Sequence, residues 1–376
     1  MIYLNNAATS YPKPKEVLEV QEVALSLPPE SQHRSNSVAG GKDTAGLCRE
    51  KLSRLLGITC PGRIFFTSGA TESLNRIFRG LPKDCRTVIA TQTEHNSVLR
   101  PIYNIPGFEV AIAACDGTGR VDPSSLEEAF SKVRGDKGVV VVNHCSNVTG
   151  AVQDVPALAK AAHRHGFQLL LDASQSAGCL PVETESWGVD LLAFTGHKAL
   201  FGPRGTGGWY AAEGVEISPL FFGGTGSDSD KYIYGPSDTP PQETGTQNLP
   251  GIAGLLAGAE YVLARGITDI QEYDASLRKE LKERLDAIPH VMTYGPAVGG
   301  PVLSFNIKGI DPSDAGYILQ NEFGITVRTG LHCSPLIHKA LGSTPGGTLR
   351  AGISCLNTHE DIMALAGAVR QISEGI

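Results

Sequence analysis

Short apolar runs that end in polar side chains are the strongest constraint on the fold of this 376-residue chain. The runs lie at residues 87–90, 139–142, 167–171 and 191–194, and helix-like segments such as 156–165 separate them. Runs of this length fit strands buried on both faces, and their alternation with helices predicts a mainly parallel sheet covered by helices. The polar residues that follow the strands are expected to gather where open α/β sheets bind their ligands.

The pattern changes toward the C-terminus. A segment at 302–307 alternates like a half-buried strand. The remaining expected strands are 63–67, 325–328 and 349–354, and the remaining expected helices are 16–27, 42–56, 252–264, 267–288, 315–321 and 360–374. These elements predict a smaller α+β domain after the α/β part. We therefore divide the chain into an N-terminal segment (1–20) that packs with the small domain, a large domain (21–265) and a small C-terminal domain (266–376).

Composition and charge exclude several classes of protein. The chain is 41% hydrophobic and 19% charged, which is typical of soluble enzymes. A net charge of −7 without a basic patch argues against nucleic acid as a partner, and no apolar run is long enough to span a membrane. The N-terminus lacks a signal-peptide pattern, and none of the eight cysteines forms a C-x-x-C pair, which argues against a zinc knuckle. We expect a cytoplasmic protein with mostly free thiols and no metal site.

Lys198 lies where the apolar run 191–194 meets a loop rich in glycine and proline that ends near Gly205. A lysine at the end of a buried strand is costly unless it is paired or used chemically. One such use is a Schiff base with pyridoxal 5'-phosphate (PLP), whose ring nitrogen needs an acidic partner. Asp172, directly after the run 167–171, supplies that partner. For a lone lysine, a surface position beside a turn is the simpler interpretation.

A second candidate site follows the expected strand 63–67. The small residues from Ser68 to Ser73 lead into helix formers. Free backbone N–H groups and the helix dipole at such a turn favour an anion, with Ser68 or Thr71 as the N-cap. A plain capped helix without a ligand has the same sequence pattern, so this stretch alone leaves both possibilities open.

Six motifs carry a resemblance over essentially the whole chain. They are Ser68-Gly69-Ala70-Thr71-Glu72, Glu94-His95-Asn96-Ser97, Ser146-Asn147-Val148-Thr149-Gly150, Asp172-Ala173-Ser174-Gln175, Thr195-Gly196-His197-Lys198 and Arg328-Thr329-Gly330-Leu331-His332-Cys333. With them the chain resembles the class V group of fold-type-I PLP enzymes, and within it the cysteine desulfurases and selenocysteine lyases. The resemblance implies a fold-type-I PLP-dependent transferase, with a mainly parallel seven-stranded sheet in the large domain and a smaller α+β C-terminal domain.

The resemblance also implies a role for each motif residue. Lys198 would hold PLP covalently and move protons, and Asp172 would pair with the pyridine nitrogen. His95 would stack on the ring, although an ordinary polar residue after a strand is the plainer interpretation. Gln175 would bond the phenolic oxygen, with Asn147 close to it. The residues expected to bind the phosphate are Ala70, Thr71, Thr195, His197 and, across a homodimer interface, Thr246.

Two further residues would act on the substrate. Arg350, in an apolar strand, would bind the α-carboxylate, because a guanidinium makes two parallel hydrogen bonds to a carboxylate, and Asn147 would lie beside it. Cys333 would be the nucleophile. It follows glycine in a loop next to His332, where a nearby His or Arg favours the reactive thiolate, although most cysteines are buried and inert. Arg328 is expected to support the wall of the site.

The expected function is the conversion of L-cysteine to L-alanine, with a persulfide left on Cys333 and passed to an acceptor protein. The alternatives are a selenocysteine lyase, another class V reaction such as transamination, epimerisation or kynureninase-like cleavage, and a catalytically silent dimeric partner protein. The chain departs from the usual Leu-Asp-Asn-Ala-Ala opening with Asn5, and also at residues 33–35 and 334–338. These departures surround the expected substrate mouth.

Overall fold

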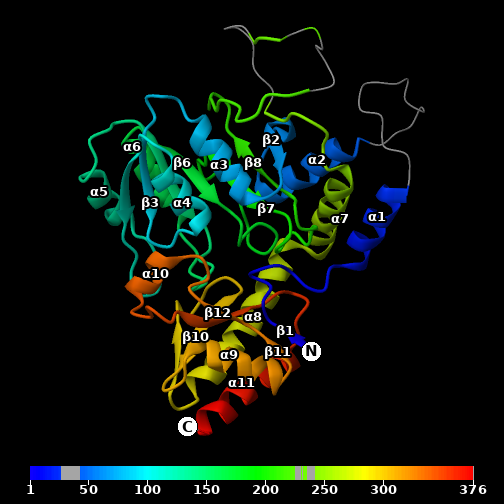
Figure 1. Ribbon diagram of the computed structural model, residues 1–376, viewed down its shortest axis with the longest axis vertical. Helices are drawn as coiled ribbons and strands as arrows, with labels where there is room; N and C mark the ends of the chain where they lie inside the picture. Colours follow the sequence, from blue (N-terminus) through cyan, green and yellow to red (C-terminus); the bar gives the residue numbers. More distant parts are fainter. Residues whose placement is uncertain (27–42, 225–229, 231, 235–241, 376) are drawn as a thin grey trace.

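The computed structural model describes residues 1–26, 43–224, 230, 232–234 and 242–375, and Figure 1 shows two parts along its long axis. The helices are α1 (Lys15–Ser26), α2 (Thr44–Leu56), α3 (Ala70–Gly80), α4 (Asn96–Asn104), α5 (Pro123–Phe130), α6 (Val155–Arg164), α7 (Leu249–Arg265), α8 (Ile267–Asp286), α9 (Pro312–Asn321), α10 (Pro335–Ala340) and α11 (His359–Glu374). The strands are β1 (Ile2–Tyr3), β2 (Ile64–Thr67), β3 (Thr87–Thr91), β4 (Glu109–Ala113), β5 (Gly138–Asn143), β6 (Gln168–Asp172), β7 (Leu191–Thr195), β8 (Gly207–Ala211), β9 (Val291–Tyr294), β10 (Val302–Ile307), β11 (Ile325–Thr326), β12 (Arg328–Gly330) and β13 (Thr348–Gly352).

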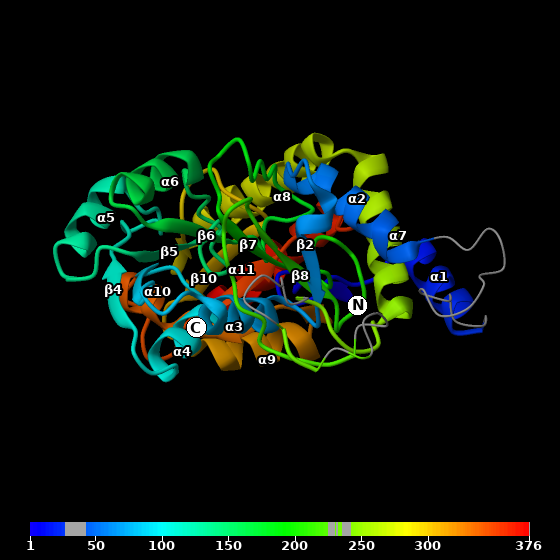
Figure 2. The ribbon, with the colours of Figure 1, turned by 90° about the horizontal axis from the view of Figure 1, so that it is seen from above.

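A seven-stranded sheet forms the centre of the larger part, in the order β2-β8-β7-β6-β5-β3-β4. Strands β3 to β7 pair in parallel, whereas β8 is antiparallel to both of its neighbours. This confirms the predicted mainly parallel α/β sheet. Seen from above in Figure 2, α2 and α6 lie on one side of the sheet and α3 and α4 on the other. Helices on both faces explain why the strands are apolar throughout.

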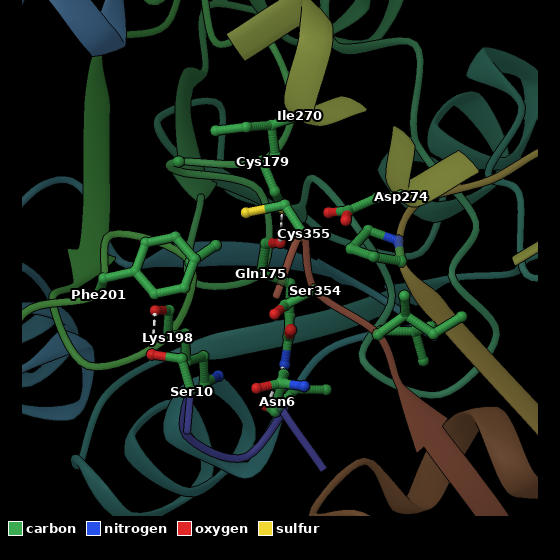
Figure 3. Close-up of a pocket in the computed structure, with 16 residues that line it drawn as sticks. Asn6, Ser10, Gln175, Cys179, Lys198, Phe201, Ile270, Asp274, Ser354 and Cys355 are labelled. Carbon is green, nitrogen blue, oxygen red and sulfur yellow. Dashed lines mark hydrogen bonds between the residues drawn. The ribbon is translucent and has the colours of Figure 1, made fainter. Parts of the chain in front are cut away.

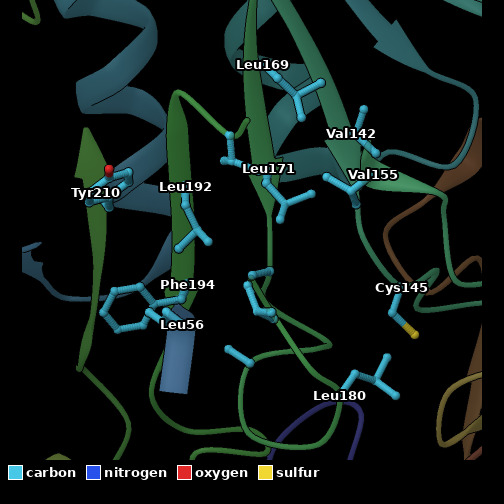
Figure 4. Close-up of a cluster of buried hydrophobic side chains, with 14 of the residues drawn as sticks. Leu56, Val142, Cys145, Val155, Leu169, Leu171, Leu180, Leu192, Phe194 and Tyr210 are labelled. Atoms are coloured by element: carbon cyan, nitrogen blue, oxygen red, sulfur yellow. The ribbon is translucent and has the colours of Figure 1, made fainter. Parts of the chain in front are cut away.

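Alternate residues of each strand enter two separate cores. Val142, Leu171 and Phe194 point toward α2, α6 and α7 in one cluster, which Figure 4 shows. Val141 and Leu170 point the other way, into a cluster with α3 and α4. Because side chains alternate along a strand, a sheet covered on both faces needs apolar residues at every position.

The smaller part contains the antiparallel sheet β12-β13-β10-β9, packed with α8, α9 and α11. Here the prediction of a half-buried strand at 302–307 is wrong, because both faces of β10 are covered. Leu303 and Phe305 enter the core of this part. Ser304 is also buried, and its Oγ donates a 2.6 Å hydrogen bond to the carbonyl of Val148 in the larger part.

The N-terminal residues join both parts. Strand β1 pairs in parallel with β11, and Leu4 is fully buried in the core of the smaller part. Helix α1 instead packs against α7, beside which it lies in Figure 1. The division of the chain at residues 20 and 265 stays a prediction.

The strands differ from the sequence-based expectation in two ways: one expected strand is divided, and the expectation has no counterpart for β1, β4, β8 and β9. The single strand expected at 325–328 is divided, since β11 pairs with β1 and β12 pairs with β13 in another sheet. Strand β8 was not expected, because glycine weakens a strand pattern. Its glycines are required by close packing: a Cβ on Gly207 would lie 2.6 Å from the Cα of Gly69.

No helix among the described residues is long and apolar enough to cross a bilayer.

Asp274 of α8 is buried beside a small cavity between the two parts of the chain. Figure 3 shows its carboxyl group beside Cys355 and across the cavity from Lys198. Its Oδ1 has no hydrogen-bond partner in the described part of the chain. Burial raises the pKa of Asp274 to about 8, although the charge of Arg265 opposes this shift.

Replacing Asp274 by Asn is expected to stabilise the protein more at pH 8 than at pH 5. An unfolded aspartate ionises near pH 4, whereas the folded carboxyl group stays protonated up to about pH 8. Its contribution to stability is therefore complete below about pH 4 and decreases as the pH rises, by about 1.4 kcal/mol per pH unit. Urea unfolding of the parent and of Asp274→Asn at about pH 5, 6.5 and 8 measures the difference. An equal pH dependence in both proteins would contradict this expectation.

Candidate functional site

A cavity of about 390 Å³ opens at the carboxyl ends of the parallel strands. Residues after β2, β3, β5, β6 and β7 line it, and Arg328 of β12 and Arg350 of β13 close it from the smaller part. Its size is in the range of cofactor and small-molecule sites. The fold therefore forms a site where open α/β sheets bind ligands.

Most of the predicted site residues meet in this cavity. Those that line it are Ala70, Thr71, His95, Asn147, Asp172, Gln175, Thr195, His197, Lys198 and Arg350. Cys333 lies at its edge, in contact with Arg328, whereas Thr246 is exposed outside it. The lining residues that sequence analysis missed include Ala7, Ala8, Asn143, Ser174 and Arg204. The position of Asn143 at the end of an apolar strand could have predicted it as a lining residue. Arg204 lies in a loop rich in glycine and proline, where no sequence pattern distinguishes it from a surface arginine.

Lys198 and Asp172 both line the cavity. Asp172 ends β6, is 2% exposed, and its Oδ1 accepts a 2.9 Å hydrogen bond from the backbone N–H of Ser174. Burial lowers the pKa of Lys198 to about 8, partly opposed by the charge of Asp172. With this pKa, roughly a tenth of the amine is unprotonated at pH 7 and about half at pH 8, which supplies the form that a nucleophile or base requires.

The N-terminal segment fixes the turn that carries Lys198. The carbonyl of His197 accepts hydrogen bonds from the backbone N–H of Ser10 at 3.0 Å, from Thr9 Oγ1 at 3.1 Å and from Lys13 Nζ at 2.9 Å. Ser10 Oγ also donates to the carbonyl of Lys198 at 2.9 Å. This segment holds the backbone on both sides of the peptide bond that precedes Lys198.

An anion cradle lies at the start of α3. The N-cap is Gly69, whose φ is 148° and whose position offers no side-chain hydrogen bond. The prediction of Ser68 or Thr71 as N-cap is therefore wrong: Ser68 Oγ and its backbone N–H both donate to Glu72 Oε2. The first turn of α3 lines the cavity and has no capping side chain, which suits an anion-binding helix terminus.

Two histidines in the cavity are neutral. Burial and the charge of Lys198 lower the pKa of His95 and of His197 to about 4. The Nδ1 of His95 accepts a 3.0 Å hydrogen bond from the backbone N–H of Ser97 at the start of α4. A proton on His95 is therefore placed at Nε2, which leaves the neutral ring oriented by the helix terminus.

Several buried polar atoms of the cavity have no hydrogen-bond partner among the described residues. They are Asn143 Oδ1, Ser174 Oγ, His197 Nδ1, His332 Nδ1 and Arg350 Nε. Buried polar groups are normally paired, so donors and acceptors of this kind indicate a polar ligand. An anionic, aromatic cofactor with ring and phosphate acceptors fits this set together with the cradle at α3.

The loop that carries Cys333 is attached to the larger part through Asn147. The amide Nδ2 of Asn147 donates to the carbonyl of His332 at 2.7 Å, and its Oδ1 accepts from Ser334 Oγ at 2.7 Å. The backbone N–H of Asn96 donates to the Cys333 carbonyl at 2.7 Å. These contacts hold the loop although His332 and Cys333 have φ values of 50° and 62°, in the left-handed region.

Arg328, rather than His332, is the cationic neighbour of the Cys333 thiol. Its Nη2 lies 3.5 Å from Cys333 Sγ. His332 turns away, with Nε2 3.0 Å from Thr348 Oγ1, and burial lowers its pKa to about 2. The neutral His332 ring therefore contributes no positive charge to this thiol.

Arg328 and Arg350 occupy directly opposed positions on β12 and β13. Arg350 is 1% exposed, and burial together with the charge of Arg328 lowers its pKa to about 9. Its Nη1 donates to the carbonyl of Asn147 at 2.9 Å. Like charges in opposed positions repel, so this wall of the cavity favours an anion.

Groups of three or more His, Cys, Asp or Glu side chains suited to a metal ion do not occur within the residues that the structure describes.

A family model, curated relatives and solved structures all match this chain over most of its length. The family model for aminotransferase class-V matches residues 2–365. A probable cysteine desulfurase from Methanothermobacter thermautotrophicus is 36% identical over 335 residues, which cover 86% of this chain and 82% of that protein. A cysteine desulfurase from Escherichia coli strain K12 / DH10B is 29% identical over 99% of this chain and 93% of its own length. The solved apo structure of the cysteine desulfurase from Thermococcus onnurineus NA1 has a TM-score of 0.86 and 31% identity, over 100% of this chain and 95% of that one.

Replacing Asn147 by Ala is expected to loosen the Cys333 loop. Two hydrogen bonds of about 1 kcal/mol each are lost, so local opening of residues 331–335 should become roughly 30-fold more frequent. Hydrogen–deuterium exchange of these amides measures the change. Asn321→Ala, at an exposed position at the end of α9, is the control and should leave the loop unaffected. Equal exchange in parent and Asn147→Ala would show that other contacts hold the loop.

Proposed function

Because the chain belongs to the class V aminotransferase family, we propose that it is a PLP-dependent cysteine desulfurase, which converts L-cysteine to L-alanine and leaves a persulfide on Cys333. One observation carries this proposal: a single cavity contains Lys198 and Asp172, and Cys333 lies at its edge against Arg328. The relatives named cysteine desulfurase, which match over most of the chain, support the same activity.

The cavity residues fit PLP. Lys198 would bind its aldehyde carbon, and Asp172 would pair with the ring nitrogen. His95 and Gln175 would contact the ring, and the phosphate would lie in the cradle at α3. The residues for this phosphate site are Ala70, Thr71, Thr195 and His197. When bound, PLP supplies an electron sink for the electrons left on the substrate's α-carbon.

Binding of L-cysteine would use the wall formed by β12 and β13. Arg350 binds the α-carboxylate, since its guanidinium is buried and has no carboxylate partner within the described residues. This contact orients the α-carbon toward Lys198. The amine of Lys198, with a pKa of about 8, then removes the α-proton and later returns a proton to the carbon product.

The sulfur atom passes to Cys333. The Cys333 sulfur attacks the substrate sulfur, the substrate C–S bond breaks, and a new S–S bond forms. The electrons of the broken bond stay with the carbon product, which takes up a proton to become L-alanine. The products are one L-alanine and one Cys333 persulfide, so no external oxidant is required. Arg328 holds the sulfur in place by its hydrogen bond.

A homodimer, an acceptor protein for the persulfide and a cytoplasmic location also belong to this proposal. Thr246 is exposed in the single chain and lies outside the cavity, which supports a role toward a second subunit. The described cysteines are all unpaired, which fits a reducing compartment.

Cys333→Ser is expected to reduce alanine formation from L-cysteine at least a hundredfold, because the attacking sulfur is lost. Cys60→Ser, which changes an exposed cysteine away from the cavity, should retain the parental rate. The measurement is alanine released by each purified protein with L-cysteine and a reductant. Alanine formation by Cys333→Ser at the parental rate would refute the mechanism. If only turnover of L-selenocysteine survives in this variant, the selenocysteine lyase alternative is favoured.

A mixed dimer tests the role of Thr246. The dimer combines one Lys198→Ala chain with one Thr246→Ala chain. The site in the Lys198→Ala chain is inactive. If Thr246 reaches across the interface, the site in the Thr246→Ala chain keeps its own Lys198 and receives the intact Thr246 of the other subunit. We expect about half the parental activity and parental retention of PLP at that one site. If Thr246 acts within its own chain, the mixed dimer behaves like the Thr246→Ala homodimer with half of its sites removed.

A further inference from the structure

Arg350 is a buried cation without an anionic partner among the described residues. Arg328, directly opposite on β12, adds a like charge. The groups that favour the charged form of Arg350 are Cys333 and Tyr3. Burial raises the pKa of the Tyr3 phenol above its ordinary value, so Tyr3 is neutral at physiological pH. An uncompensated buried charge is costly, and an incoming anion relieves that cost.

Asn5 lies beside the guanidinium as a neutral acceptor. Its Oδ1 accepts a hydrogen bond from Arg350 Nη2 at 3.3 Å. The backbone of Asn5 is held at two points. Asn5 forms an isolated parallel β-bridge with Gly352, and its carbonyl accepts a 3.0 Å hydrogen bond from the N–H of Ala8. The amide therefore occupies the position from which a carboxylate would neutralise Arg350.

Most of the hydrogen-bonding capacity of Arg350 stays available. A guanidinium has five N–H donors, of which one goes to the carbonyl of Asn147 and one to Asn5. The Nε–H is buried and has no partner in the described chain. The remaining donors are enough for a bidentate contact with a small carboxylate.

We propose that Asn5 sets the affinity of this cavity for the substrate carboxylate, because a neutral amide leaves the full charge of Arg350 for the ligand. A carboxylate at position 5 would form an ion pair with Arg350, and the substrate would then have to compete with it. The identity of the natural carboxylate ligand rests on the proposed function, whereas the affinity of the site for a simple carboxylate is independent of that function.

Asn5→Asp is the informative change, because aspartate has the shape of asparagine and keeps the acceptor toward Arg350. No hydrogen bond from Asn5 Nδ2 occurs in the described residues, so the change removes no donor contact there. Asn5→Ala removes the acceptor without adding charge. Asn321→Asp adds the same charge at an exposed position on α9 and is the matched control.

The probe is propionate labelled with 13C at the carboxyl group, titrated into each purified holoenzyme by NMR. Propionate has no amine and no thiol, so its binding requires no turnover. Uncharged propionamide is the paired ligand. We expect the parent to bind propionate more tightly than propionamide and Asn5→Asp to weaken propionate binding at least tenfold. Asn5→Ala and Asn321→Asp should change it less than about threefold. With L-cysteine, Asn5→Asp should raise KM by a similar factor and leave kcat within about twofold.

The proposal is wrong if Asn5→Asp binds propionate as tightly as the parent, or if the parent does not distinguish propionate from propionamide. Thermal unfolding of Asn5→Asp shows whether the variant is folded, and unchanged propionamide binding shows that the cavity is intact. Failure of the parent to release alanine from L-cysteine would instead refute the proposed function and leave the propionate result valid.

Discussion

The parallel register of the central strands is the constraint on which the site depends. Asn143 at the end of β5 pairs with Asp172 at the end of β6, and Asp172 in turn pairs with Ala193 of β7. Because parallel strands end at the same edge of the sheet, the acid at the end of β6 and the lysine after β7 reach one cavity. The apolar residues that fill both faces of these strands fix that register, since a shift by one residue would exchange the two cores.

The second requirement is the connection between the two parts of the chain. Asn147 contacts three groups of the smaller part: the His332 carbonyl, Ser334 Oγ and, through its own carbonyl, Arg350. One loop after β5 thereby places both the proposed nucleophile and the proposed carboxylate ligand. We infer that Asn147 acts chiefly as a positioning residue, although it also lines the cavity as the sequence predicts.

Two buried acids, Glu94 and Asp274, form no ion pair within the described residues. Burial raises the pKa of Glu94 to about 8, and its Oε1 accepts from Thr91 Oγ1 and from the N–H of Asn143. Burial likewise raises the pKa of Asp274 to about 8, and Asp274 and Lys198 line the same small cavity. Both acids are neutral near pH 7, so they add no negative charge beneath a cavity whose outer wall carries Arg328 and Arg350. The electrostatic character of the site is therefore cationic, which suits a ligand with a phosphate and a carboxylate.

The sequence by itself determined the sheet type and most residues of the cavity. Strands buried on both faces require uninterrupted apolar runs, and the polar residues after those runs mark the ligand edge. It also identified Lys198, Asp172 and Arg350 through their motifs. Only the tertiary structure decided that His332 turns toward Thr348, that Arg328 faces Cys333, and that Asn5 lies against Arg350. Periodicity reports which side chains are buried along one segment. It carries no information on which side-chain atoms meet, because these contacts depend on the turn before Cys333, on the pairing of β12 with β13 and on the N-terminal segment lying against β13.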